Sequence, residues 1–375
     1  MNRQKILLII EAMSGGAGRH VRDLIKNLDQ KRFELYCIYS TQRVDDNFYE
    51  EIAELKKHAT LFECPDIVRE INPSKDLKAY RFISQKIKEL NPEVVHCNSS
   101  KAGVLGRLAA KRRRVKKVYY TPHAYSFFAP EFSNKKKFVF VSIERILSKV
   151  ATTKTFCVSD SEKEQALLNK IAADSEIEVI YNGIRPQTPE NYLKIREFLN
   201  LPLEAVIIGN NARMSEQKNP WLFIEIAQEI VKENALYHFV WVGDGPLFES
   251  VKGFVEQQGL TRNIHLLGNR SDSEFIVANY DIFLITSLYE GLPYALIEAM
   301  RAGVPIVGKK VVGVKEMIIE DYNGRFFNEV SEISSIFNTV QQKKIFCHNS
   351  LATFHEKYTM GQMIERIEEQ YLLVN

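Results

Sequence analysis

Two glutamates, Glu290 and Glu298, lie eight positions apart around a predicted turn from a strand into a helix. The apolar residues 281–287 predict a buried strand, and residues 294–302 predict the helix that follows a tight turn. The first N–H groups of such a helix have no acceptor within it and attract a phosphate. Because Glu290 precedes the helix and Glu298 lies more than a turn inside it, the two carboxylates can address different parts of one ligand. We expect one to hold a sugar and the other a ribose.

Two cations, Arg213 and Lys218, follow another predicted strand, residues 205–210, just ahead of a helix. The guanidinium group is a planar fork of donors and the ammonium group is a compact charge, so together they suit a diphosphate. In a partly dry cleft they would stabilise negative charge on a departing phosphate. A surface pair without a ligand is the alternative interpretation. The turn at 242–246 is predicted to line the same edge, although its glycines also fit a purely structural role.

A run of glycines at residues 15–18 lies between a predicted strand, residues 5–10, and a predicted helix from about residue 19 to 28. Glycine lets the backbone approach a phosphate or a substrate hydroxyl closely. The run lacks the G-x-G-x-x-G spacing of a dinucleotide site, so a plain tight turn is an equally good interpretation.

Strands and helices alternate along the whole chain, which predicts an α/β fold with parallel, doubly wound sheets. The break at Asn182–Gly183 divides it into two similar lobes. We expect domains at 1–183 and 184–357, with a last helix in 358–375. Further strands are predicted at 33–40, 94–97, 118–121, 155–158, 178–181, 237–242, 264–267 and 305–307. Ligands bind at the carboxyl ends of such strands, so the loops there should face a shared cleft.

The chain has 375 residues, of which 45% are hydrophobic and 26% charged, and this suits two globular domains. Its five cysteines are widely spaced, which fits neither a disulfide framework nor a zinc site and predicts a reducing, cytoplasmic compartment. The N-terminus has no signal-peptide pattern, and no apolar run approaches the roughly 18 residues of a spanning helix. We therefore expect any contact with a membrane to be peripheral, on the inner face of the cell membrane.

The charge of the chain is concentrated in one window. Residues 101–150 hold thirteen Lys and Arg against two Glu, a net charge of +11, and the remaining residues together carry −8. This asymmetry predicts an anionic partner, and Phe127, Phe128 and Phe132 are candidate anchors in an anionic membrane surface. A solvated helix face is the alternative. Nucleic acid is not expected as a partner, because no recognition motif accompanies the charge.

The order and spacing of these motifs resemble the retaining glycosyltransferases of family 4, which have the two-lobed GT-B fold. The resemblance spans nearly the whole chain, and it implies that the last helix crosses back onto the first lobe. It rests on residues 15–18, 96–103, 122–124, 181–184, 242–246 and 287–293, on Arg213 with Lys218, and on Glu298.

The resemblance implies a role for each matching residue on the donor side. Glu298 is similar to the glutamate that binds the nucleotide ribose, and Glu290 to the one that holds the donor sugar. Arg213 and Lys218 match the pair that binds the diphosphate. The implied donor site also includes the glycine run and the two loops of the second lobe, with Gly15, Gly16, Gly268, Arg270, Gly291, Leu292 and Pro293 as members.

On the acceptor side, the resemblance implies that His123 touches the donor sugar near the reacting carbon, and Ser100, Lys101 and Tyr125 are expected to bind the acceptor. His123, Glu290, Arg213 and Lys218 form the implied catalytic set. A lone histidine after a strand is more often structural, and we leave His96 in that role.

The implied reaction transfers a sugar, with retention of configuration, from a nucleoside diphosphate sugar to a hydroxyl group. We expect uridine as the base and no cofactor. No metal is expected either, and consistently the chain has no fitting D-x-D triplet. The family's bacterial members build capsule, exopolysaccharide or O-antigen, and they imply a saccharide acceptor on a polyprenyl diphosphate. A nucleotide-sugar 2-epimerase of the same fold, or a catalytically silent nucleotide-sugar-binding subunit, is the alternative.

Overall fold

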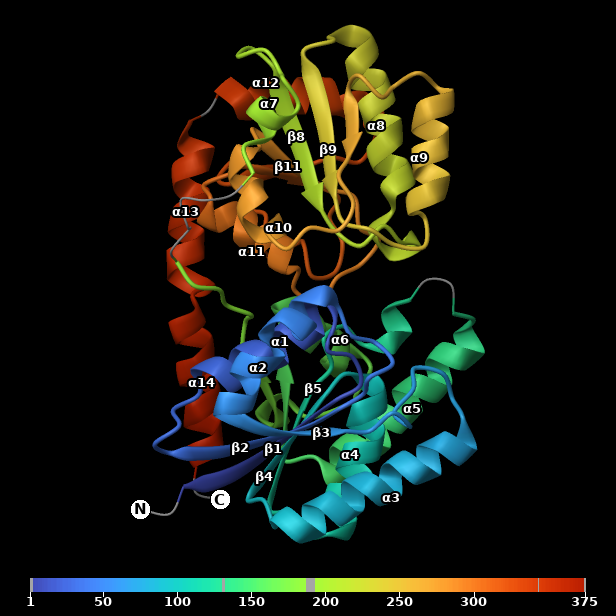
Figure 1. The fold of residues 1–375 in the computed structure, drawn as a ribbon, viewed down its shortest axis with the longest axis vertical. Coiled ribbons are helices and arrows are strands. Elements are labelled where there is room, and N and C mark those ends of the chain that lie inside the picture. Colours follow the sequence, from blue (N-terminus) through green and yellow to red (C-terminus); the bar gives the residue numbers. More distant parts are fainter. Residues whose placement is uncertain (1–2, 130–131, 187–192, 343, 374–375) are drawn as a thin grey trace. The chain divides into compact units, whose positions relative to one another are not determined.

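The computed structural model describes residues 3–129, 132–186, 193–342 and 344–373, which form two α/β units (Figure 1). The first unit comprises Met1–Asn182 and Met363–Asn375, and the second comprises Gly183–Gln362. The divisions predicted after residues 183 and 357 lie within a few residues of these. Each unit has one parallel, doubly wound sheet, so the predicted fold class is confirmed.

The first unit has a seven-stranded sheet in the order β3-β2-β1-β4-β5-β6-β7. Its order reverses at β1 and β4, which are hydrogen-bonded neighbours with Ile10 opposite Asn98. The elements are β1 (Gln4–Ile10), α1 (Gly15–Asn27), β2 (Phe33–Tyr39), α2 (Asp46–His58), β3 (Ala59–Glu63), α3 (Pro73–Leu90), β4 (Val94–Asn98), α4 (Ser100–Arg112), β5 (Lys117–Thr121), α5 (Asn134–Ala151), β6 (Lys154–Cys157), α6 (Asp160–Leu168), β7 (Ile177–Val179) and the final helix α14 (Met360–Leu372).

Helices cover both faces of this sheet (Figure 1). Successive side chains of a strand point to opposite faces. Leu7 and Ile9 of β1 accordingly join a buried cluster with α3, α4 and α5, to which Ile83, Leu105 and Val141 belong. Helix α14 packs on the other face, so both layers bury apolar surface.

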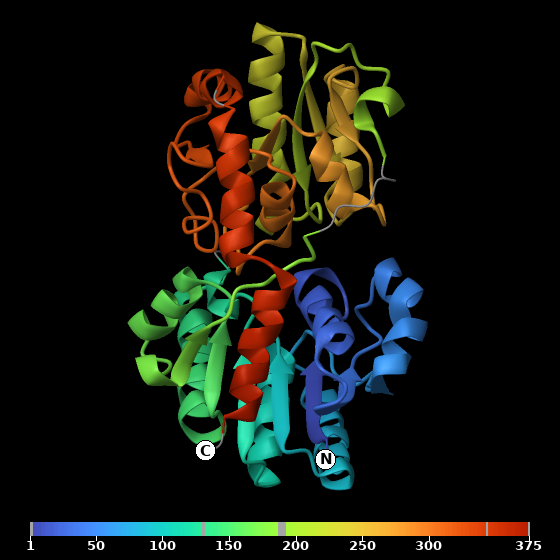
Figure 2. The ribbon, with the colours of Figure 1, turned by 90° about the vertical axis from the view of Figure 1, so that its left-hand side faces the viewer.

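Helix α14 is tied to the first unit by buried contacts of Tyr371, and the prediction that the last helix returns to the first lobe is confirmed (Figure 2). The Tyr371 ring stacks on Tyr119 with ring centroids 5.6 Å apart, and its hydroxyl lies 2.6 Å from His96 Nδ1. His96 Nε2 lies 2.8 Å from Thr121 Oγ1. Both nitrogens of His96 are therefore engaged within the unit.

The second unit has a six-stranded sheet in the order β10-β9-β8-β11-β12-β13. Its order reverses at β8 and β11, which pair through Phe283 opposite Gly209. The elements are α7 (Ile195–Phe198), β8 (Val206–Asn211), α8 (Pro220–Glu233), β9 (Tyr237–Val242), α9 (Phe248–Gln257), β10 (Ile264–Leu266), α10 (Ser273–Ile276), β11 (Ile282–Ile285), α11 (Tyr294–Arg301), β12 (Ile306–Gly308), β13 (Gly324–Phe326), α12 (Ile333–Gln342) and α13 (Ile345–Lys357).

Three features differ from the sequence-based expectations. Strands β3 and β13, at the edges of the two sheets, were not predicted. Helix α1 begins at Gly15, so the glycine run forms the first turn of the helix rather than a loop before it. Among the described helices, none has the length and apolarity needed to cross a membrane.

Candidate active site

The second unit brings Arg213, Lys218 and Glu290 to one edge of its sheet. Arg213 and Lys218 follow β8, and Glu290 follows β11. Because β8 and β11 are adjacent parallel strands at the point where the strand order reverses, the loops after them flank the position where ligands bind in doubly wound sheets.

Hydrogen bonds join these two loops directly. The Leu288 N–H donates to the Gln217 carbonyl at 2.8 Å, and the Gln217 side-chain amide donates to the Tyr289 carbonyl at 3.0 Å. The Thr286 hydroxyl donates to the Lys218 carbonyl at 2.9 Å. The loop that carries Lys218 is therefore fixed against the loop that leads to Glu290.

Lys218 and Glu290 form an ion pair, with Lys218 Nζ 2.5 Å from Glu290 Oε1. Glu290 is 5% exposed, and the backbone of Gly313 packs against it so closely that an added Cβ would lie 2.5 Å from the Glu290 carbonyl oxygen. A phosphate at Lys218 would share the ammonium group with this carboxylate. Arg213 differs, since its side chain is exposed and makes no ion pair within the described part of the chain.

The turn at 242–246 supports the Arg213 loop through close backbone packing. A Cβ at Gly243 would lie 2.2 Å from the Ala212 carbonyl oxygen, and one at Gly245 would lie 2.3 Å from that of Met214. The Met214 N–H also donates to the Asp244 carbonyl at 2.9 Å. These glycines therefore have a structural role, the second of the two interpretations left open by the sequence.

Helix α11 carries Glu298, which is 5% exposed, and it begins directly after Pro293. Burial and the negative charge of Glu298 raise the pKa of Tyr280 well above its ordinary value. The Tyr280 hydroxyl donates to Asn211 Oδ1 at 2.6 Å, at the carboxyl end of β8. Glu298 thus lies near the same edge of the sheet as Arg213.

The other predicted donor residues lie on neighbouring loops. Arg270 is occupied by Asp272, with Nε and Nη2 donating to its two carboxylate oxygens at 2.8 and 3.2 Å. The Gly268 carbonyl accepts the Gly243 N–H at 2.7 Å, which joins this loop to the turn at 242–246. Leu292 is buried in front of α11.

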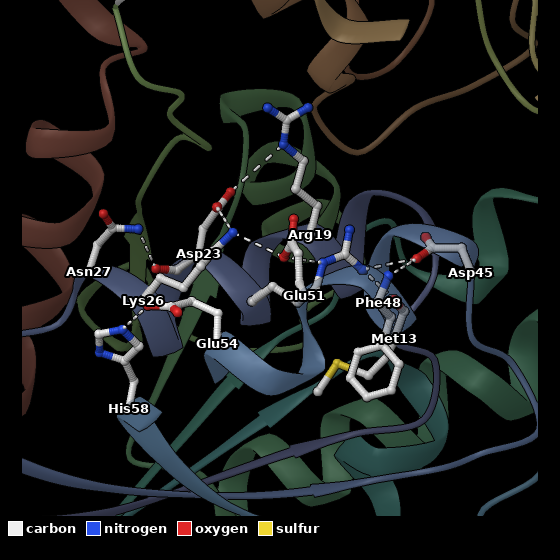
Figure 3. Close-up of polar contacts among 11 residues, drawn as sticks. Met13, Arg19, Asp23, Lys26, Asn27, Asp45, Phe48, Glu51, Glu54 and His58 are labelled. Carbon is white, nitrogen blue, oxygen red and sulfur yellow. Dashed lines mark hydrogen bonds and ion pairs between the residues drawn. The ribbon is translucent and has the colours of Figure 1, made fainter. Parts of the chain in front are cut away.

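In the first unit, the glycine turn at the start of α1 is held by Arg22 and by Asp45, which Figure 3 labels beside Phe48. The buried Arg22 guanidinium donates to the Met13 carbonyl and lies 3.3 Å from Asp45 Oδ1. Asp45 Oδ2 accepts the Gly15 N–H at 3.1 Å. A Cβ at Gly18 would lie 2.2 Å from the Met13 carbonyl carbon, so only glycine fits there. Neither Arg22 nor Asp45 was singled out from the sequence.

This arrangement changes what the glycines can offer a ligand. The Gly15 N–H is already bonded to Asp45. The Gly16 N–H belongs to the first turn of α1 and has no intrahelical acceptor, so it is the better candidate to meet an anion. Asp45 also caps α2 by accepting the Phe48 N–H at 2.9 Å, so one carboxylate sets both helix ends.

His123 follows β5 and is oriented by the end of β4. Its Nε2 lies 3.0 Å from Asn98 Oδ1, and the Asn98 amide group donates to the His96 carbonyl at 3.3 Å. With the amide so oriented, Nε2 carries the proton and Nδ1 is an acceptor. Burial lowers the pKa of His123 well below 6.5, as do the neighbouring His20 and His96, so the ring is neutral.

His20 on α1 is a neighbour of His123 that the sequence analysis missed. The two rings meet edge to face, with centroids 4.8 Å apart. His20 Nδ1 lies 3.0 Å from Asn182 Oδ1, and burial lowers the pKa of His20 to about 4. A single histidine within a helical pattern gave no signal of this pairing.

The predicted acceptor residues are not equally available. Ser100 lies at the start of α4, with its hydroxyl 2.7 Å from that of Ser126. Lys101 pairs with Asp76 at 2.7 Å. Tyr125 is 1% exposed and belongs to the core, so a direct contact with an acceptor is not supported.

Comparisons with known proteins cover almost all of the chain. Residues 14–188 match the family described as Glycosyltransferase Family 4, and residues 191–352 match the family described as Glycosyl transferases group 1. The two matches correspond to the two structural units.

Among curated relatives is a UDP-Gal:alpha-D-GlcNAc-diphosphoundecaprenol alpha-1,3-galactosyltransferase of Escherichia coli, which is 29% identical over 330 residues, or 83% of each chain. The O-antigen biosynthesis glycosyltransferase WbnH of the same species is 28% identical over 232 residues, 62% of each chain. The structure of Anabaena Alr3699/HepE with UDP and glucose has a TM-score of 0.80 and 21% identity, covering 98% of this chain and 99% of that one. The similarity to the Anabaena structure shows a shared fold.

Proposed function

Because this chain belongs to family 4 of the glycosyltransferases, which have the GT-B fold, we propose that it transfers a sugar from a UDP-sugar to a saccharide hydroxyl in bacterial surface polysaccharide synthesis. The observation that carries this proposal is the meeting of Arg213, Lys218 and Glu290 at the β8–β11 edge, with Glu298 on the adjoining helix. Two cations beside two buried carboxylates suit a ligand with a charged diphosphate between two polyhydroxylated ends.

The chemistry follows from where charge develops. As the glycosidic bond breaks, negative charge grows on the UDP diphosphate, and Arg213 and Lys218 stabilise it. A phosphate oxygen takes the proton of the acceptor hydroxyl on the face that the leaving group occupied, so the configuration is retained. Glu290 holds hydroxyls of the donor sugar, and the neutral His123 offers Nδ1 as a hydrogen-bond acceptor. We propose no divalent metal and no other cofactor, so saturating EDTA should leave the rate unchanged.

The acceptor we propose is a sugar linked to a polyprenyl diphosphate. The Escherichia coli galactosyltransferase supports this, since its name gives such an acceptor. The test offers UDP-galactose, UDP-glucose and UDP-N-acetylglucosamine with a short-chain N-acetylglucosamine diphosphate lipid. We expect one donor to yield a disaccharide lipid with an α-linkage. Donor isomerisation without acceptor would indicate a 2-epimerase, binding without turnover would indicate a silent subunit, and a β-linkage would contradict retention.

The glycine turn gives a first prediction. Asp45→Ala should raise the KM for the donor about tenfold. Without Asp45 the glycine turn shifts, and the Gly16 N–H loses its hydrogen bond to the donor phosphate, which contributes about 1.5 kcal/mol. The same change removes the cap of α2, so the unfolding temperature should fall as well. The measurement is donor KM together with thermal unfolding.

The control for this prediction is Glu54→Ala, farther along α2. Glu54 pairs with Lys57 and also with His58, and Figure 3 shows the second of these contacts. It should leave the KM for the donor unchanged. A wild-type KM for Asp45→Ala in folded protein would remove Asp45 from the account of the donor site.

We propose a different membrane surface from the one expected from the sequence. Phe127 is only 7% exposed and cannot anchor in lipid, and Arg107 is buried in a pair with Glu144 at 2.7 Å. Helix α5 instead exposes a strip of apolar side chains among lysines. The strip consists of Phe138, Val139, Ile146 and Val150, with Lys135, Lys136 and Lys149 also exposed on this helix. This pattern suits a helix lying on an anionic bilayer at the cytoplasmic face.

A second prediction tests that surface. Phe138→Asp with Ile146→Asp should release the protein from vesicles of 30% phosphatidylglycerol, because two charges replace apolar side chains that would enter the bilayer. Sedimentation with vesicles measures the bound fraction, and turnover of the short-chain acceptor should persist. Leu203→Asp, an exposed residue of the second unit, is the control. If the double variant sedimented with vesicles as fully as the Leu203→Asp control, this membrane surface would be contradicted.

A further inference from the structure

The turn that carries His123 has an unfavourable backbone. His123 and the next residue, Ala124, both have left-handed conformations, with φ of 56° and 79°. Residues with a Cβ atom avoid this region because the side chain crowds the backbone. Two in succession persist only where surrounding groups hold them, and such strain gathers at functional sites.

The carboxylate of Glu162, in the first turn of α6, holds this turn. Its Oε1 accepts the Ala124 N–H at 2.7 Å, and its Oε2 accepts the Val158 N–H at 2.9 Å. The side chain is 0% exposed. Its own position is fixed because the Glu162 N–H donates to the hydroxyl of Ser159, the N-cap of α6, at 3.1 Å. One carboxylate therefore ties the turn after β5 to the end of β6.

We propose that Glu162 is a positioning residue for His123, acting through the backbone of Ala124. With the turn fixed, the imidazole takes its place against Asn98 and the His20 ring, and Nδ1 keeps its direction. The inference rests on the proposed function, in which His123 contacts the donor sugar near the reacting carbon. The spacing of Ser159 and Glu162 is that of an ordinary helix start. It gives no sign that the Glu162 carboxylate also accepts the Ala124 N–H.

The first test removes the carboxylate. Glu162→Ala should lower kcat about tenfold to a hundredfold, since a misplacement of about 1 Å near the chemistry has effects of that order. The donor is the UDP-sugar used fastest in the transfer panel. Affinity for UDP alone should stay unchanged, because Arg213, Lys218 and Glu298 are intact. Amide hydrogens in residues 121–128 should exchange faster, as measured by mass spectrometry.

The second test is a rescue. Glycine takes left-handed backbone conformations without the Cβ penalty, so Ala124→Gly reduces the need for a group that holds the turn. The double variant Glu162→Ala with Ala124→Gly should therefore regain most of the lost kcat. Both kcat values refer to folded protein, so a change in stability alone does not produce this recovery. Glu144→Gln, another buried carboxylate of this unit, should lower the unfolding temperature and leave kcat unchanged.

A wild-type kcat for folded Glu162→Ala, or no recovery on adding Ala124→Gly, overturns the inference. If Glu162→Ala does not fold, Glu162→Gln with and without Ala124→Gly is judged by the same two criteria. Absence of transfer by the wild-type protein would count against the proposed function instead. In that case, unchanged exchange at 121–128 in the Glu162 variant overturns the positioning role, and faster exchange supports it.

Discussion

Replacing Arg213 and Lys218 together with alanine is expected to lower kcat/KM for sugar transfer by at least about a thousandfold. Removal of a single preorganised donor to a developing anion lowers rates by about a hundredfold to a thousandfold. Both cations act on the same diphosphate, so their effects need not add fully. The measurement is initial rates with the preferred UDP-sugar at several donor concentrations.

The control for this prediction is Lys252→Ala, an exposed lysine on α9. It removes a cation from the same unit and should leave kcat/KM unchanged. Arg213→Lys adds a finer comparison, because it keeps the charge and loses the planar fork. A double alanine variant within tenfold of the wild-type rate would show that the diphosphate is stabilised elsewhere.

Glu290→Gln is expected to lower kcat about a hundredfold, with a smaller effect on the affinity for UDP. The carboxamide keeps the shape of the side chain, but it loses the charge that strengthens hydrogen bonds from sugar hydroxyls. It also removes the negative charge that pairs with Lys218. The measurement is kcat at saturating donor together with calorimetric binding of UDP.

Lys218→Met separates the two roles of Glu290. If Glu290 contacts the sugar, the double variant should be slower than either single variant, since the two side chains act on different parts of the donor. If Glu290 only holds Lys218, Glu290→Gln adds nothing in the Lys218→Met background. A wild-type kcat for Glu290→Gln alone would contradict both roles.

The strands were predictable where burial makes them apolar on both faces. Residues 237–242 were predicted as a strand, and β9 has the same bounds, because central parallel strands are continuous hydrophobic runs. The edge strands β3 and β13 were not predicted, because neither is a long and fully buried apolar run. Ala59–Glu63 is largely half-buried or exposed, and Gly324–Phe326 is only three residues long.

Helix α1 shows how tertiary packing overrides local preference. Glycine disfavours helices, so the glycine run was expected to precede the helix. In the structure, Gly18 packs on Met13, and Arg22 fixes the same backbone by bonding to the Met13 carbonyl. The first helical turn forms because these contacts replace the stability that the residues lack by themselves.

The residues of the candidate site were easier to predict from the sequence than the contacts between them. Arg213, Lys218 and Glu290 could be placed after predicted strands, and the sheet order then brings the ends of β8 and β11 together. That Lys218 pairs with Glu290 depends on loop geometry, which the strand pattern leaves open. Asp45 and Glu162 were missed because each acts on a turn far away in sequence.

The most direct test of this account compares binding of UDP, UMP and uridine to the wild-type protein and to Arg213→Ala with Lys218→Ala by calorimetry. The wild-type protein should bind UDP more tightly than UMP, because the second phosphate meets the two cations. In the double variant, the affinity for UDP should fall to that for UMP while uridine binding is retained. An undiminished preference for UDP in the double variant would contradict the claim that Arg213 and Lys218 bind the diphosphate.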